Sequence, residues 1–401
     1  MDARESAATD PVTTERKTCR GCDAAQLESV LDLGTQFLPR FVAEPDNSLP
    51  KSPLHLVRCA DCGLLQLAHT VSADLLYREF WYRSGINESM RVALHDLVRD
   101  AVRRIVRGTW LDIGANDGYL LSRVPQTFRK VAVEPALNLR DELGEHADVV
   151  VSDYFSAAAI NGVKCDVITS AAMFYDLDNP GAFLDDIRNS LANGGIWINQ
   201  LNDSPTMMKA NAFDAICHEH LCYYDLHTLR ALYDTHGLRI AAVTHNDVNG
   251  GSIRVTAMRH QDLPDKEHLP MTGMPRTSAE DAQRFARRII KWKDVFGELV
   301  SNLGPGLWCY GASTKGSTLL QYLDMNPSFE AVADRNPRKH GLRMVGSWLP
   351  IKNEEEFRVA APRYALVLPW AFKSEFMARE KDARAAGTNF VFPLPNPEVV
   401  L

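Results

Sequence analysis

The sequence predicts an α/β protein in three parts: a small cysteine-containing unit, a parallel-sheet domain and a second α/β unit. Three observations support this. Two Cys-x-x-Cys pairs lie near the N-terminus, short apolar runs alternate with helical patterns in the middle of the chain, and this alternation resumes after a long amphipathic helix. A chain of 401 residues, 45% of them hydrophobic, is long enough for several cores. We expect a disordered leader over 1–17 and domains over 18–86, 87–262 and 263–401.

Composition and charge argue against several classes of partner. The formal net charge of -7 provides no basic field for a nucleic acid, and no run of Lys and Arg interleaved with aromatics compensates locally. No apolar stretch approaches the roughly 20 residues that span a bilayer, and the polar start "MDARESAATDPVTTERK" has no apolar signal core. We therefore expect a cytoplasmic protein that binds neither nucleic acid nor membrane. The sequence leaves the oligomeric state open.

The first unit contains a candidate metal site made of Cys19, Cys22, Cys59 and Cys62. Four thiolates satisfy tetrahedral Zn²⁺ at about 2.3 Å each. A redox motif is the alternative for each pair, but two pairs in a small unit with few apolar residues favour zinc. Because all four ligands are thiolates, no position is open for water, and we expect the zinc to be structural.

The segment "YREFWYRSG", residues 77–85, connects the first unit to the second. It packs four aromatic residues and a Ser-Gly turn between two helical patterns. An interdomain seam and a ligand contact are both compatible with this composition, and both interpretations remain open.

The middle region predicts a sheet that is parallel except at one edge. Its apolar runs are "TWLDIG", "KVAVEP", "ADVVVSD", "CDVITSA" and "GGIWINQ", followed by "LRIAAVTH" and "SIRVTAMRH". Only "NDVNGG" separates the last two runs, which is too short for a helical crossover, so these runs should pair as an antiparallel hairpin. A parallel sheet that ends in such a hairpin is the architecture of class I S-adenosylmethionine (SAM) methyltransferases.

A long amphipathic helix opens the third part. Ser278 and Asp281 stand at the positions of a capping box, and one apolar face follows, made of Phe285, Ile289, Trp292, Phe296 and Leu299. The segment "GLWCYGASTKGSTLLQYL" then predicts a buried strand, a small-residue loop and a helix, and "FEAVADRNP" and "YALVLPW" predict further strands. We therefore expect a second α/β domain here.

The segment "WLDIGANDGYLL" is the candidate cofactor loop, because it follows a strand and opens a helix. Ligands of open α/β sheets bind beyond the carboxyl ends of the strands, and the G-x-x-x-G spacing favours a methyl donor over a dinucleotide. Glu134 is placed to accept the ribose hydroxyls, and Asp153 is placed to accept the adenine amino group. The expected cofactor-binding residues are Asp112, Gly114, Asn116, Gly118, Glu134 and Asp153.

The segment "AICHEHLCYYD", residues 215–225, concentrates groups that handle protons. C-methylation needs a base that removes a proton beside a carbonyl, and histidine suits this task because its pKa lies near operating pH. Glu219 can orient the ring or bind a substrate hydroxyl, and Tyr223 and Tyr224 can bind substrate oxygens. A metal site is the rival interpretation, but the i, i+2 spacing of His218 and His220 does not match a helical H-x-x-x-H motif.

With these motifs in order, the chain resembles the sugar-nucleotide C-methyltransferases of deoxysugar biosynthesis, over nearly all residues from 18 to 401. The motifs are CxxC…CxxC, "DIGANDG", "FDAICHEHLCYYDL", "NDVNGGSIRVT" and "YGASTKGSTLLQ". The resemblance implies a zinc lobe, a SAM methyltransferase core and a C-terminal domain that helps to hold a nucleotide sugar. It implies His220 as base, Glu219 as a substrate contact, Tyr82 as an aromatic that closes the site, and Gly311 with Lys315 at the diphosphate. Tyr175 completes the catalytic set, and His218, Tyr223, Tyr224 and Asn249 complete the substrate set.

The chain departs from the family pattern at several positions. Tyr175 stands where enzymes of antibiotic sugars usually have His, and Cys217 stands where they have Tyr. The segments "MFYDLDNP" and "CHEHL" resemble instead a branch found in polysaccharide and natural-product clusters. The chain also differs from that branch at four positions. It has Asn199 where Glu is more usual, Asn202 where Tyr is, Cys222 where Glu is, and Ala371 where His is.

Other functions remain open from the sequence. One is O- or N-methylation of a different acceptor, and another is nucleotide-sugar binding without catalysis. A nicotinamide enzyme is disfavoured by the glycine spacing.

Overall fold

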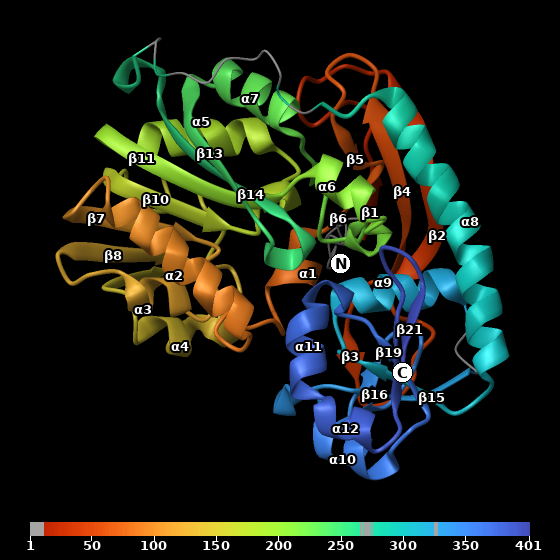
Figure 1. Ribbon diagram of the computed structural model, residues 1–401. Helices are drawn as coiled ribbons and strands as arrows, with labels where there is room; N and C mark the ends of the chain where they lie inside the picture. Colours follow the sequence, from red (N-terminus) through yellow and green to blue (C-terminus); the bar gives the residue numbers. More distant parts are fainter. Residues whose placement is uncertain (1–11, 265–266, 268–273, 275, 325–327) are drawn as a thin grey trace, which may run out of the picture.

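The computed structural model describes residues 12–264, 267, 274, 276–324 and 328–401. Three α/β parts lie around a common centre, with the methyltransferase-like sheet, the N-terminal sheet and the C-terminal domain each contributing one side (Figure 1). No helix within the described residues is both long enough and apolar enough to cross a membrane.

The start of the chain differs from the expected leader. Residues 1–11 lie outside the described residues, but β1 (Thr13–Glu15) pairs antiparallel with β6 (His69–Val71). Arg16 also donates its backbone N–H to the Ala68 carbonyl at 2.7 Å. Residues 13–16 are therefore part of the N-terminal lobe, because the open edge of β6 satisfies their backbone groups.

The central domain confirms the predicted sheet. Its seven strands lie in the order β13-β14-β11-β10-β7-β8-β9, parallel except for β14, which runs antiparallel to both β11 and β13. The strands are β7 (Gly108–Ile113), β8 (Phe128–Val133), β9 (Val149–Val151), β10 (Cys165–Ala171), β11 (Leu191–Asn202), β13 (Leu238–Asn246) and β14 (Ser252–Arg259). The hairpin of β13 and β14 matches the expectation from the short "NDVNGG" connection.

Helices cover both faces of this sheet. The helices α2 (Glu88–Val102), α3 (Tyr119–Arg123) and α4 (Arg140–Gly144) pack on one face, where Leu97 and Leu121 meet Trp110. The helices α5 (Pro180–Ser190) and α7 (Leu226–Thr235) pack on the other, where Ile187 and Tyr233 meet Trp197. Both faces of the strands are thus buried, which explains why the sequence shows continuous apolar runs rather than alternation.

The N-terminal lobe is a sheet in the order β12-β5-β4-β2. Its own strands are β2 (Leu27–Phe37), β4 (Lys51–Cys59) and β5 (Leu65–Leu67), whereas β12 (Cys222–Tyr223) comes from the central domain. The short helix α1 (Ala73–Tyr77) follows β6, and α6 (Ser204–Lys209) follows β11. The lobe expected over 18–86 therefore includes a strand from residues far along the chain.

The C-terminal domain is a six-stranded sheet in the order β18-β16-β15-β19-β20-β21. Its strands are β15 (Leu307–Tyr310), β16 (Phe329–Ala333), β18 (Ile351–Lys352), β19 (Tyr364–Val367), β20 (Asn389–Phe392) and β21 (Glu398–Val400). Its helices are α9 (Thr314–Leu323), α10 (Glu354–Ala360), α11 (Lys373–Arg379) and α12 (Lys381–Ala385). Strand β17 (Arg343–Met344) leaves this sheet and pairs with β3 (Phe41–Val42) of the N-terminal lobe.

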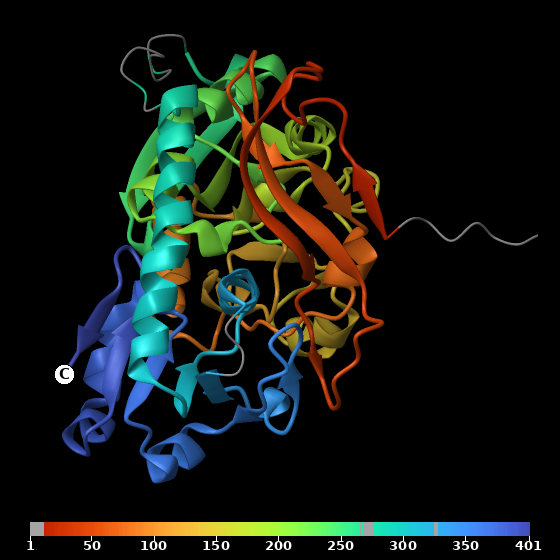
Figure 2. The same cartoon turned by 90° about the vertical axis from the view of Figure 1, so that its right-hand side faces the viewer.

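The helix α8 (Ala279–Leu303) runs along the outside of the molecule, from the N-terminal sheet to the C-terminal domain (Figures 1 and 2). Its start confirms the predicted capping box between Ser278 and Asp281, and its buried face includes Phe285, Ile289 and Trp292. Gln283 donates to the Ser29 carbonyl of β2 at 3.0 Å. The helix thereby fixes two parts of the chain relative to each other.

The four predicted cysteines lie together at one end of the N-terminal lobe. All four Sγ atoms lie within 4.8 Å of one another. The Cys19 Sγ lies 3.6 Å from that of Cys62, and the Cys22 Sγ lies 3.6 Å from that of Cys59. Cys19 also accepts hydrogen bonds from the Gly21 amide at 3.3 Å and the Gln66 side chain at 3.2 Å. Such donors stabilise thiolates, so the cluster fits Zn²⁺.

Replacing Phe357 by Ala should destabilise the C-terminal domain. Its ring is 0% exposed and lies 5.1 Å from Tyr310 and 5.8 Å from Trp308. We expect the free energy of unfolding to fall by about 3–5 kcal/mol in chemical denaturation. Val359→Ala on the same helix is the control, because Val359 is 81% exposed and its loss should change stability by less than about 0.5 kcal/mol. Equal effects from the two changes would contradict this account of the core.

Replacing Cys59 by Ala should abolish zinc binding. A cysteine cluster that has lost one ligand no longer closes the tetrahedron, and metal analysis of the purified variant should find little zinc. The unfolding temperature should fall, because metal binding contributes directly to the stability of such lobes. Cys165→Ala removes a buried thiol outside the cluster and should retain the metal. Unchanged zinc content in Cys59→Ala would refute the site.

Candidate active site

A cavity of about 930 Å³ lies where the three parts meet. Its walls come from the loops that follow β7, β8 and β10, from the segment that connects β6 to α2, and from the loop before α9. The structure brings most of the predicted site residues to this cavity: Tyr82, Asp112, Gly114, Asn116, Glu134, Tyr175, His218, Glu219, His220, Gly311 and Lys315.

The loop after β7 forms one end of the cavity. Gly114 has φ +69°, and a Cβ there would meet Met173 at 3.3 Å, so both backbone strain and space favour glycine. Glu134, at the end of β8, accepts hydrogen bonds from the amides of Asn116 at 2.8 Å and Ala136 at 2.9 Å. Asp112 accepts from the Thr169 hydroxyl at 2.6 Å. These contacts hold two carboxyl groups at the strand ends.

Burial determines the charge of these carboxyl groups. It raises the pKa of Asp112 to about 7 and also raises the pKa of Glu134, with backbone hydrogen bonds opposing the shift of Glu134. A group whose charged form is disfavoured by burial gains most from a cationic or hydroxyl-bearing ligand. This end of the cavity is therefore suited to a ligand with an ammonium group and a ribose.

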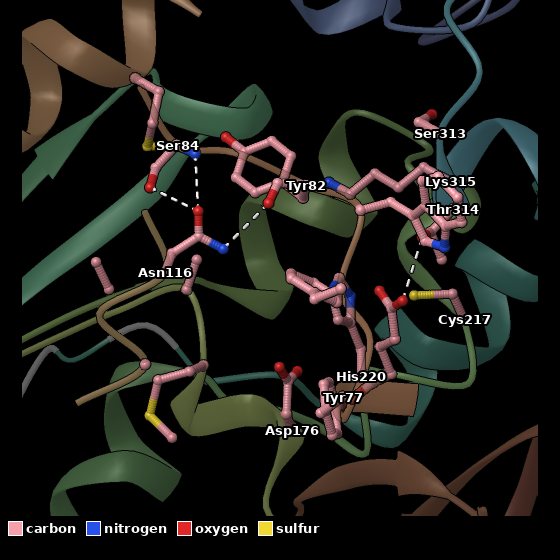
Figure 3. A pocket seen from close by; sticks show the side chains of 18 of the residues that line it. Tyr77, Tyr82, Ser84, Asn116, Asp176, Cys217, His220, Ser313, Thr314 and Lys315 are labelled. Carbon is pink, nitrogen blue, oxygen red and sulfur yellow. Dashed lines mark hydrogen bonds between the residues drawn. The ribbon is translucent and has the colours of Figure 1, made fainter. Parts of the chain in front are cut away.

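The segment 82–85 is tied to the same loop. Asn116 accepts from the Ser84 amide at 3.0 Å and the Ser84 hydroxyl at 3.1 Å, and it donates to the Tyr82 carbonyl at 3.2 Å (Figure 3). Asp117 accepts from the Gly85 amide at 2.7 Å. The aromatic segment is thus both an interdomain connection and part of the cavity wall, and the ligand contact expected of "YREFWYRSG" stays a prediction.

His220 is held in one orientation by backbone contacts. Its Nδ1–H donates to the Ala215 carbonyl at 2.8 Å, so Nε2 carries no proton in the neutral ring. The Tyr175 ring packs edge-on against it, with centroids 4.5 Å apart. Burial, and then the charge of Lys315, lower the pKa of His220 to about 3. The imidazole is therefore neutral near pH 7, with an unprotonated nitrogen on a cavity wall.

Three acidic or thiol groups surround this histidine: Glu219, Asp176 and Cys217. Burial raises the pKa of Glu219 to about 7, although Thr314 donates to Glu219 Oε1 at 3.2 Å. Donor atoms of Cys217, Glu219 and His220 lie within 4.8 Å of one another, a set that also suits a metal ion. The charge of Lys315, however, acts on both Cys217 and His220 and opposes a cation there. The arrangement favours acid–base chemistry.

The C-terminal side of the cavity contains both signs of charge. Arg335 and Arg379 pair with Glu354 and Lys339 pairs with Asp334, whereas Lys315 lines the cavity at the start of α9. Gly311 has φ +90°, and a Cβ there would meet Pro369 at 2.6 Å. The sequence led us to expect the Gly311 amide at the diphosphate. This amide instead donates to the Ala333 carbonyl at 2.7 Å and is therefore not available to a diphosphate. The first amides of α9, Thr314 and Lys315, remain at the helix N-terminus for an anion.

Several predicted residues have other surroundings. Asp153 is exposed and pairs with Arg78 at 3.1 Å, because β9 ends at Val151 and the next residues turn away; Tyr154 and Phe155 line the cavity instead. Gly118 begins α3 and packs beside His146. Asn249 lies in the turn Val248–Gly250, and its side chain is outside the described residues.

The residues around His220 mainly position it. Tyr223 donates its hydroxyl to the His220 carbonyl at 2.9 Å, and the Tyr224 ring packs 5.2 Å from Phe174 in the core. His218 borders the cavity, but its ring bonds the Ser52 carbonyl at 2.9 Å, and burial lowers its pKa to about 4. The geometry thus assigns none of these three side chains to substrate.

Sequence reasoning did not single out Tyr77, Asp176 or Thr314, all of which line the cavity. Tyr77 donates its hydroxyl to the Glu219 carbonyl at 2.9 Å. Two signals in the sequence could have pointed to them. Tyr77 belongs to the aromatic segment 77–85, and Asp176 directly follows Tyr175.

Family models match three successive parts of the chain. A zinc-binding domain model matches residues 19–77, a methyltransferase domain model matches 86–243, and the C-methyltransferase C-terminal domain model matches 247–395. The C-methyltransferase NovU of Streptomyces niveus is 28% identical over 405 residues, which covers 95% of this chain and 96% of NovU.

Solved methyltransferase structures are more distantly similar to part of this chain. Magnesium protoporphyrin IX methyltransferase from Synechocystis, with bound SAM, is 12% identical with a TM-score of 0.34 and covers 42% of this chain and 79% of its own. The N-methyltransferase NodS from Bradyrhizobium japonicum is 15% identical with a TM-score of 0.35 and covers 43% and 89%.

The three matched domains follow one another in the order of the three parts of the fold, and the curated relative spans nearly the whole chain. The methyltransferase models and the match to NovU make SAM the methyl donor, and the four clustered cysteines fit the zinc-binding domain model. The chain belongs to the SAM-dependent C-methyltransferases that combine a zinc-binding domain, a methyltransferase domain and a C-methyltransferase C-terminal domain.

Proposed function

We propose that the enzyme methylates a carbon beside the carbonyl of a nucleotide-linked keto-deoxysugar, with His220 as the base. The observation that carries this proposal is the fixed tautomer of His220. Its Nδ1–H is held by the Ala215 carbonyl, so Nε2 is the proton acceptor on the wall of a cavity shared by all three domains. Such an acceptor removes a proton only if the carbon acid is held within hydrogen-bond reach.

The two ends of the cavity support two different ligands. SAM supplies an electrophilic methyl group when bound, and Asp112, Gly114, Asn116 and Glu134 are placed for its amino-acid and ribose parts. Tyr82 and Ser84 cover this end. Gly118 is the N-cap residue of α3 and supports the loop without contacting SAM. We assign Asp153 no contact with SAM, because it pairs with Arg78.

Lys315 and the start of α9 support a diphosphate at the C-terminal end. Lys315 and the first amides of α9 provide charge and hydrogen bonds for an anion, while Gly311 keeps the loop close to Pro369. Glu219 lies between the ends, beside His220, and its raised pKa suits a contact with a sugar hydroxyl. A nucleotide sugar bound in this way would present its ring to His220. The proposed enzyme would act in the cytoplasm, and its methylated sugar would be used to build a natural product or a polysaccharide.

Labelled SAM and a panel of nucleotide-linked keto-deoxysugars test the proposal. We expect methyl transfer to a carbon next to the carbonyl, identified by NMR of the product. Methyl appearing on oxygen or nitrogen would instead establish an O- or N-methyltransferase and refute the proposed acceptor chemistry.

Replacing His220 by Ala should lower the rate of C-methylation by about 10²–10⁴-fold, the usual contribution of a positioned base. SAM affinity, measured by calorimetry, should not change, because His220 is not at the donor end. His245→Ala on β13 is the control, since His245 is exposed. A His220→Ala enzyme with near-normal turnover would exclude this residue as the base.

Replacing Lys315 by Gln should raise KM for the nucleotide sugar on the order of 10- to 100-fold, because a charged hydrogen bond to an anion is lost. Lys291→Gln on the exposed side of α8 is the control. An unaltered KM would remove Lys315 from the binding site.

The same Lys315→Gln change removes a charge that lowers the pKa of His220. The pKa of His220 should therefore rise, and NMR titration of the imidazole can follow this change.

A further inference from the structure

Asp176 is a cavity residue to which the account above gives no role. It lies in the 3-10 turn Phe174–Asp176, directly after Tyr175, whose ring packs against His220. Its Oδ1 is buried without a hydrogen-bond partner in the described part of the chain. In Figure 3 its carboxyl group extends into the same space as His220. A buried carboxylate oxygen without a donor is costly in its charged form, so this position favours the protonated acid.

The surroundings of Asp176 favour a carboxylic acid over a carboxylate. The groups that interact with it electrostatically are Tyr77, Tyr175, Cys217, Glu219 and Tyr223, and none of them carries positive charge. Burial, and then the charge of Glu219, raise the pKa of Asp176 well above its usual range. A carboxyl group kept protonated in this way can donate a hydrogen bond near neutral pH.

Three hydroxyl donors near His220 are already engaged within the protein, and among the described residues the Tyr175 phenol remains as the competing donor that the test below must separate from Asp176. Tyr77 donates to the Glu219 carbonyl, Tyr223 to the His220 carbonyl, and Thr314 to Glu219 Oε1. Removal of a proton beside a carbonyl places negative charge on the carbonyl oxygen, and a positioned donor at that oxygen lowers the barrier. The cavity therefore requires a donor that is not otherwise engaged, and Asp176 meets this requirement.

We propose that Asp176 is a further catalytic residue that donates a hydrogen bond to the carbonyl oxygen of the acceptor while His220 removes the neighbouring proton. The proposal rests on the function proposed above. The C–H electron pair forms the C=C bond of the enolate, the proton moves to His220 Nε2, and the carbonyl oxygen takes the negative charge beside the Asp176 O–H. The enolate carbon then attacks the methyl group as the bond from sulfur to methyl breaks, and the carbonyl re-forms.

Proton exchange without methyl donor tests this step separately. The probes are the thymidine- and uridine-diphosphate-linked 4-keto-6-deoxyglucoses in D₂O with S-adenosylhomocysteine, and deuterium entry beside the carbonyl is followed by NMR. Asp176→Leu and Asp176→Asn are a matched pair, because both keep the shape but only Asn retains a weaker donor. Asp141→Asn on α4 is an exposed control.

We expect exchange to fall about 100- to 1,000-fold in Asp176→Leu, and by less in Asp176→Asn, while S-adenosylhomocysteine binding stays unchanged. Exchange in Asp176→Leu within threefold of the unaltered protein, or equal losses in both variants, would overturn the proposal. A larger loss in Tyr175→Phe would also overturn it and assign the donor to the phenol. If the unaltered protein neither exchanges nor methylates carbon with these probes, the proposed function fails as well.

Discussion

The backbone of the loop 215–221 is the constraint on which the active site depends. Strand β12 joins its end to the N-terminal lobe, and Leu221 donates to the Tyr175 carbonyl at 2.8 Å and accepts from the Leu67 amide at 2.9 Å. The carbonyl of Ala215 then fixes the His220 tautomer. The tautomer is thus set within the loop itself, whereas the contacts of Leu221 with Leu67 and of β12 with β5 attach the end of the loop to the N-terminal lobe. The N-terminal lobe therefore supports the backbone that carries His220.

Assembly of the three parts also buries the titratable groups of the site. The pairing of β3 with β17 and the contact of α8 with β2 close the N-terminal and C-terminal sides around one cavity. Burial raises the pKa of Asp112 to about 7 and that of Glu219 to about 7, and it lowers the pKa of His220 to about 3. All three shifts have the same largest cause, and all three leave the site with less charge than isolated side chains would carry. Electrostatic contacts between buried groups are stronger than the same contacts in water.

The sequence predicts the regular parts of this molecule well because they depend on local patterns. Apolar runs and short connections determined the sheet and its terminal hairpin, and the Ser278 capping box predicted the start of α8. Short pairings such as β12 with β5 leave no periodic signal, so the packing of Tyr224 against Phe174 was not foreseen. Asp153 was misplaced because β9 ends two residues before it. Asp176 was missed because its character depends on neighbours distant in sequence.

The lowered pKa of His220 affects how the remaining groups must act. A base whose conjugate acid is strong abstracts a proton poorly, so the enolate needs stabilisation from a donor on the opposite side of the reacting atoms. Lys315 contributes to that lowered pKa, and a diphosphate that neutralises Lys315 removes part of the cause. Binding of the anionic end of the acceptor would then strengthen the base at the same time as it positions the carbon acid. Under the proposed function, recognition of the nucleotide and activation of His220 would therefore be linked through one side chain.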